Sequence, residues 1–119
     1  MRVLVVDNQR RARQSMKALL SAWHTFGDIY EAESGIEAVR LAQEYMPNLI
    51  LMDARMPNMS GVEALKIIKV KHPHIKVIVL SMYPDIKNEA LEAGADAFIS
   101  KGDPPEVLHE VLAKIMGIS

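Results

Sequence analysis

Short apolar runs alternate along the whole chain with longer segments in which apolar and polar residues mix. Three of the short runs, residues 3–6, 49–52 and 77–80, are apolar at every position. Continuous apolar runs of this length are typical of strands in a parallel sheet that is covered on both faces. The pattern therefore predicts strands at residues 3–6, 28–32, 48–52, 76–80 and 97–100.

The segments between these runs repeat their apolar residues every three or four positions, as amphipathic helices do. Two predicted helix starts carry a capping-box pattern, Ser34 with Glu37 and Ser60 with Glu63. In that pattern the serine accepts from the backbone N–H of the glutamate, and the glutamate accepts from the serine N–H. Gly94 is placed to end the fourth helix.

Five strand–helix units in strict alternation predict a single α/β domain over residues 1–119. Right-handed crossovers place helices on both faces of a five-stranded parallel sheet. Five such units favour the flavodoxin-like strand order 2-1-3-4-5. In this order the connections reverse direction between strands one and three, and ligands bind at the carboxyl ends of those strands.

The composition argues against several classes of function. The formal net charge of −1 offers no field for nucleic acid, and Arg10, Arg11 and Arg13 are interpreted as the solvated face of a helix. The absence of cysteine excludes disulfides and thiol chemistry. The chain enters a strand without a charged leader and has no segment long enough to span a bilayer. We therefore expect a cytoplasmic protein that does not bind membranes.

One polar residue stands at the end of each of four predicted strands: Asp7, Asp53, Ser81 and Lys101. Taken alone, each has an ordinary explanation, since an aspartate after a strand is more often a turn former or a helix cap. Because the carboxyl ends of parallel strands share one edge of the sheet, we expect the four to converge.

These residue types together support phosphoryl transfer to a carboxylate. Asp53 is the expected nucleophile, as in aspartyl-phosphate enzymes. Carboxylates such as Asp7 and Asp53 are ligands for Mg²⁺, which neutralises charge between the donor and the acceptor. Lys101 supplies a positive charge and Ser81 a hydroxyl donor to the phosphoryl oxygens.

Four stretches of the sequence resemble the receiver domain of bacterial two-component response regulators. They are residues 3–7 (VLVVD), 51–57 (LMDARMP) with Ser60 and Gly61, 79–81 (VLS) and 93–101 (AGADAFISK). Residues 80–84 (LSMYP) and 100–106 (SKGDPPE) most resemble receivers that precede a LuxR-type helix-turn-helix.

This resemblance implies a phosphorylation-dependent switch that catalyses its own phosphorylation and dephosphorylation on Asp53. The implied Mg²⁺ ligands are Asp7, its neighbour at position 8, Asp53 and the backbone carbonyl of Arg55. Ser81 and Lys101 would bind the phosphoryl oxygens, and Phe98 matches the aromatic switch position.

The resemblance also implies partners. A sensor histidine kinase would donate the phosphoryl group, and the surface of the fourth helix, fifth strand and fifth helix would relay it, with a homodimer as one outcome. DNA would be reached only through an output domain that this chain does not contain.

Two positions depart from the receiver pattern. Asn8 stands where receivers usually have a second acidic residue, so we expect weaker Mg²⁺ binding. Gly102 stands where many receivers have a proline after the lysine, so we expect a trans bond there. Asn8 keeps open a second hypothesis, a pseudo-receiver that binds partners without phosphorylation. An FMN carrier is disfavoured, because residues 7–11 (DNQRR) contain no glycine for a phosphate loop.

Overall fold

The computed structural model describes residues 1–23 and 27–117, and residues 24–26 and 118–119 lie outside this description. Helices follow strands in regular alternation, with one short 3₁₀ turn, η1 (Pro84–Ile86), before the fourth helix. The strands are β1 (Arg2–Val6), β2 (Asp28–Ala32), β3 (Leu49–Asp53), β4 (Lys76–Ser81) and β5 (Ala97–Ser100). The helices are α1 (Arg10–Trp23), α2 (Gly35–Tyr45), α3 (Gly61–Lys71), α4 (Lys87–Glu92) and α5 (Pro105–Met116).

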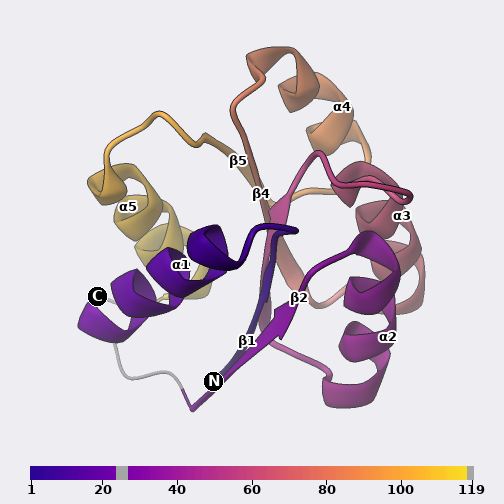
Figure 1. Ribbon diagram of the computed structural model, residues 1–119, viewed down its shortest axis with the longest axis horizontal. Helices are drawn as coiled ribbons and strands as arrows, with labels where there is room; N and C mark the ends of the chain where they lie inside the picture. The colour runs from indigo at the N-terminus through magenta and orange to yellow at the C-terminus, as the bar shows by residue number, and fades with distance from the viewer. Residues whose placement is uncertain (24–26, 118–119) are drawn as a thin grey trace.

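The strands form one parallel sheet in the order β2-β1-β3-β4-β5, which confirms the predicted topology. Figure 1 shows α1 and α5 on one face of the sheet and α2, α3 and α4 on the other. The strand order places β1 and β3 side by side at the centre, with Val3 of β1 opposite Leu49 of β3. Their carboxyl ends are therefore neighbours.

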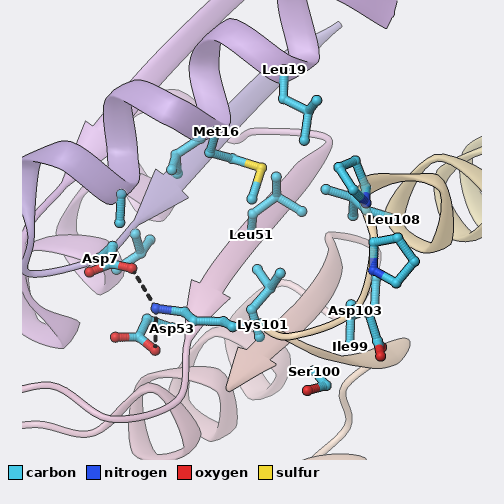
Figure 2. A pocket seen from close by; sticks show the side chains of 16 residues that line it. Asp7, Met16, Leu19, Leu51, Asp53, Ile99, Ser100, Lys101, Asp103 and Leu108 are labelled. Atoms are coloured by element: carbon cyan, nitrogen blue, oxygen red, sulfur yellow. Dashed lines mark hydrogen bonds and ion pairs between the residues drawn. The ribbon is translucent and has the colours of Figure 1, made fainter. Parts of the chain in front are cut away.

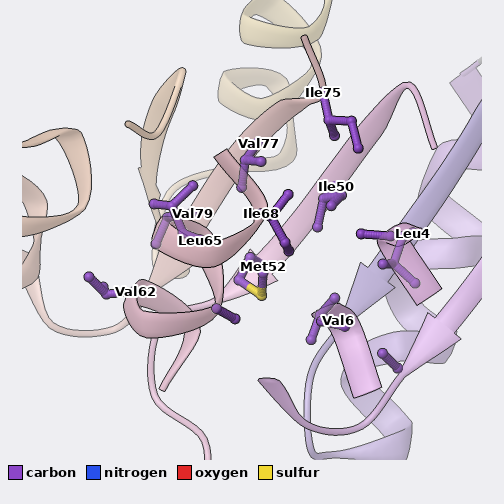
Figure 3. Packing of buried hydrophobic residues seen from close by; sticks show 14 of the residues in the cluster. Leu4, Val6, Ile50, Met52, Val62, Leu65, Ile68, Ile75, Val77 and Val79 are labelled. Atoms are coloured by element: carbon purple, nitrogen blue, oxygen red, sulfur yellow. The ribbon is translucent and has the colours of Figure 1, made fainter. Parts of the chain in front are cut away.

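Each face of the sheet supports its own apolar cluster. Leu4, Ile50 and Met52 face the layer of α2, α3 and α4, where Leu65 and Ile68 of α3 pack over them (Figure 3). The alternate strand residues face α1 and α5, since successive side chains of a strand point to opposite faces. Burial on both faces explains why the central strands are apolar throughout.

The two predicted capping boxes differ. At α3 the box is complete: Ser60 Oγ accepts from Glu63 N at 3.2 Å, and Ser60 N donates to Glu63 Oε1 at 3.3 Å. At α2 only the first bond forms, from Glu37 N to Ser34 Oγ at 3.1 Å, because Glu37 Oε1 accepts from the N–H of Glu33 instead. The two serines differ in φ, −152° at Ser34 and −67° at Ser60, and so in the direction of their N–H groups.

Strand ends and helix ends otherwise lie close to the predicted positions. The third strand is one residue later than expected, because Asn48 stands before it and accepts from the N–H of Arg2 through Oδ1 at 2.8 Å. Gly94 follows α4 with a φ of +108°, as its predicted role in ending that helix requires. The bond from Lys101 to Gly102 is trans, as are all peptide bonds of the described residues. Within residues 1–23 and 27–117, no helix is both long and apolar enough to cross a bilayer.

Gly61 allows the start of α3 to lie directly against the end of β3. Its N–H donates to the carbonyl of Ala54 at 2.9 Å. A Cβ atom at position 61 would lie 2.0 Å from the carbonyl oxygen of Asp53, a distance that no side chain tolerates. Glycine is therefore required here for close approach, and the contact supports the strand end that carries Asp53.

We predict that Gly61→Ala destabilises the fold by about 1–3 kcal/mol, the usual cost of inserting a methyl group into a filled space. Gly102→Ala is the matched control, because the nearest atom to its new Cβ would be Ser100 Oγ at 3.7 Å. Urea unfolding of both variants measures the difference. Equal stability of the two variants would show that the close packing of Gly61 against the end of β3 does not require glycine.

Candidate functional site

The carboxyl edge of the sheet gathers the predicted polar residues. Asp7 directly follows β1, Asp53 and Ser81 are the last residues of β3 and β4, and Lys101 directly follows β5. Asp7, Asp53 and Ser81 are the buried polar or charged residues among those described, with 6%, 8% and 2% of their surface exposed. Buried polar groups at one edge of a sheet need partners.

The ammonium of Lys101 lies between the two carboxylates (Figure 2). Its Nζ donates to Asp7 Oδ2 at 2.8 Å and lies 3.2 Å from Asp53 Oδ1. Because both carboxylates approach one atom, they also lie close to each other. The structure thus brings three of the four predicted residues into direct contact.

The charges of this group perturb one another. Burial raises the pKa of Asp53, and the nearby Asp7 carboxylate raises it further, while Lys101 acts in the opposite direction. Burial acts to lower the pKa of Lys101, but its hydrogen bond to Asp7 and its attraction to Asp53 outweigh this, so the pKa of the lysine is raised. Lys101 is therefore a cation, and by formal charge the group contains two carboxylates and one ammonium.

Asp7 is held by the start of α1. Its Oδ1 accepts from the N–H of Gln9 at 2.9 Å, and its backbone carbonyl accepts from Arg13 Nη1 at 2.8 Å. Arg13 Nε also donates to Glu31 Oε1 at 3.0 Å, and only 12% of the arginine side chain is exposed. The interpretation of Arg13 as part of a solvated face is therefore wrong. No local sequence pattern indicates this ion pair, because Arg13 lies on α1 and its partner Glu31 lies on β2.

Ser81 lies at the same edge, but its hydroxyl is engaged elsewhere. Ser81 Oγ accepts from the N–H of Tyr83 at 2.9 Å, within the loop that follows β4. The backbone carbonyl of Ser81 accepts from Lys101 N at 2.9 Å, which ties this strand end to the lysine. Phe98, opposite Val79 in the β4–β5 register, is half-buried against the cluster under α2, α3 and α4.

The two remaining predicted metal ligands lie at the rim. Asn8 is exposed directly after Asp7. Arg55 is also exposed, and its guanidinium lies 4.0 Å above the ring of Tyr83 and 3.7 Å from Asp85 Oδ2. The Arg55 side chain thus links the loop after β3 to the loop after β4. The role expected of its backbone carbonyl stays a prediction.

The oxygen atoms at this edge suit Mg²⁺. Two carboxylates approach a common point, and an amide and a backbone carbonyl lie in the flanking loops, all of them hard oxygen ligands. The part of the chain that the structure describes holds no group of three or more histidine, cysteine, aspartate or glutamate residues placed for a metal. A dication here would rely on two carboxylates and on neutral oxygens.

Comparison with known proteins identifies relatives over nearly the whole chain. The family model described as the response regulator receiver domain matches residues 3–113. The chain is 41% identical over 119 residues to the transcriptional regulatory protein YdfI of Bacillus subtilis, a match that covers 98% of this chain and 55% of YdfI. The chain therefore spans about half the length of this relative.

Solved structures show the same fold. A DNA-binding response regulator of the LuxR family from Staphylococcus aureus is 31% identical, with a TM-score of 0.87 over 95% of this chain and 96% of that one. The receiver domain of sensor histidine kinase PA1611 from Pseudomonas aeruginosa, solved with a magnesium ion in its active site cleft, is 24% identical with a TM-score of 0.84. That match covers 98% of this chain and 97% of the solved receiver-domain chain, and its low identity supports the fold alone.

Proposed function

Because this chain belongs to the receiver-domain family of two-component response regulators, we propose that it accepts a phosphoryl group on Asp53 with the help of Mg²⁺. The observation that carries the proposal is the ammonium of Lys101 between Asp7 and Asp53. An acceptor carboxylate with a cation beside it is the arrangement that phosphoryl transfer needs.

In the proposed reaction, a carboxylate oxygen of Asp53 forms a bond to phosphorus while the bond between phosphorus and a histidine nitrogen of the kinase breaks. The product is an acyl phosphate on Asp53, and the histidine is released. Mg²⁺ supplies positive charge to the phosphoryl oxygens when it is bound. Asp7, Asn8, Asp53 and the backbone carbonyl of Arg55 are its proposed ligands.

Lys101 and Ser81 respond to the added charge. The ammonium of Lys101, 3.2 Å from Asp53 Oδ1, is already placed to donate to a phosphoryl oxygen. The Ser81 hydroxyl accepts from Tyr83 and still has its own proton to donate. A shift of Ser81 toward the phosphoryl group would open space for Phe98 to turn inward, which is the proposed switch.

The proposed output is transcriptional regulation. The relatives are transcriptional regulators, and the chain covers 55% of YdfI, so we propose that an output domain carries the DNA contact. The cognate donor would be a cytoplasmic domain of a sensor histidine kinase, so we propose a cytoplasmic location for this chain. Exposed Met82, Tyr83 and Leu91, before and on α4, offer apolar surface for relay through α4, β5 and α5 or for a homodimer.

Incubation with acetyl phosphate and Mg²⁺ tests the proposal directly. Mass spectrometry should detect one added phosphoryl group on the chain and on Asp28→Asn, an exposed aspartate at the start of β2. Asp53→Asn should remain unmodified. Lys101→Met should react about 100-fold more slowly, the usual loss when a charge-stabilising group is removed.

Lack of a phosphoryl adduct on the unaltered chain would favour the pseudo-receiver hypothesis. Equal modification of Asp53→Asn would place the phosphoryl group on another residue and would refute the role of Asp53.

The substitution Asn8→Asp should tighten Mg²⁺ binding. A second negative charge beside Asp7 should lower the Mg²⁺ concentration for half-maximal phosphorylation about tenfold, because an added carboxylate at the metal site attracts the dication strongly. Asn88→Asp, on the exposed side of α4, is the matched control and should change nothing. An unchanged Mg²⁺ requirement in Asn8→Asp would show that position 8 does not contribute to the metal site.

A further inference from the structure

A cavity of about 280 Å³ extends from the charged group into the layer between α1 and α5. Figure 2 shows Met16 of α1 and Leu51 of β3 pointing toward each other across it, with Leu19 above them. Leu108 lines the wall of the cavity that α5 forms. The volume lies near the lower end of the range for small-molecule pockets.

The walls of this cavity are apolar and differ in burial. Leu51 and Leu108 are buried, with 1% and 4% of their surface exposed, whereas Met16 and Leu19 are half-buried. Exposed Pro104 and Pro105, at the start of α5, complete the wall opposite α1. The cavity is therefore accessible between α1 and the loop that follows β5, and an apolar ligand would gain by leaving water there.

One end of the cavity, at the carboxyl edge of the sheet, carries the charge. Asp7, Asp53 and Lys101 all line it, and the lysine ammonium is shared between the two carboxylates. One negative charge is thus unbalanced, and exposed Asp103 adds another at the rim. A carboxylate oxygen accepts more than one hydrogen bond, so a second donor cation can be accommodated. In the absence of a metal ion, this formal charge favours a cationic ligand over an anionic one.

From this combination we propose that the cavity binds an amphipathic organic cation, with an apolar body between α1 and α5 and an ammonium group at Asp7 and Asp53. This site goes beyond phosphoryl transfer, because binding requires neither Mg²⁺ nor modification of Asp53. The ammonium would occupy space next to the acceptor carboxylate, so an occupied cavity would oppose the arrival of another cation there.

Phenethylamine, which is protonated at neutral pH, is a suitable probe. The full chain, labelled with ¹³C at its methionine and leucine methyl groups, is titrated in buffer without Mg²⁺ so that the metal site does not enter the result. Saturable shifts should centre on Met16, Leu19, Leu51 and Leu108. The neutral 2-phenylethanol and the anionic 3-phenylpropanoate have the same ring and should bind about tenfold more weakly or worse.

Variants that fill the cavity provide the second test. Met16→Trp should abolish the methyl shifts caused by phenethylamine. Ala12→Leu, a smaller change at a lining position of α1, should weaken binding and replaces the first variant in the test if Met16→Trp does not fold. Val70→Trp on α3, where 84% of the residue is exposed, is the matched control and should bind as the unaltered chain does.

The proposal is overturned by any of three results: equal affinity for amine, alcohol and carboxylate, methyl shifts centred away from the cavity, or unchanged binding in both filled variants. Because no phosphodonor is present, these outcomes are separate from success or failure of Asp53 phosphorylation.

Discussion

The ion pairs of Lys101 with Asp7 and Asp53 are the constraint on which the rest of the site depends. Two buried carboxylates that both contact one ammonium lie close enough to repel each other, and burial and the Asp7 charge raise the pKa of Asp53. The ammonium of Lys101 reduces that repulsion, because its Nζ lies 2.8 Å from Asp7 Oδ2 and 3.2 Å from Asp53 Oδ1. The two proposed cations at this edge of the sheet, Mg²⁺ and an organic ammonium, both depend on the negative formal charge that remains.

The topology explains why a lysine takes this place. In the order β1-β3-β4-β5, the strand of Lys101 is separated from the strand of Asp53 by β4. A long, flexible side chain is needed to pass the end of β4, and the carbonyl of Ser81 fixes its starting point through the N–H of Lys101. On the other side of Asp53, the tight contact of Gly61 keeps the strand end in position. The geometry of the site is thus built from backbone contacts around three strand ends.

Much of this could be predicted from the sequence, because apolar runs identify buried parallel strands and their ends must meet at one edge. The convergence of Asp7, Asp53, Ser81 and Lys101 at one edge was predicted from that rule together with the expected strand order. Other features depend on tertiary detail that no local pattern records. Arg13 on α1 pairs with Glu31 of β2, a contact between residues far apart in the sequence. The cavity depends on how far α1 stands from α5, which periodicity does not specify.

The most direct measurement of the central claim is the titration of the Asp53 carboxyl carbon by ¹³C NMR, in the unaltered chain and in Lys101→Met. Burial and Asp7 raise the pKa of Asp53, and Lys101 opposes them. Removal of the ammonium should therefore raise this pKa further, while the neutral methionine keeps a side chain of similar length. An Asp53 pKa that is the same in both proteins would contradict the account, because it would mean that Lys101 does not stabilise the ionised carboxylate.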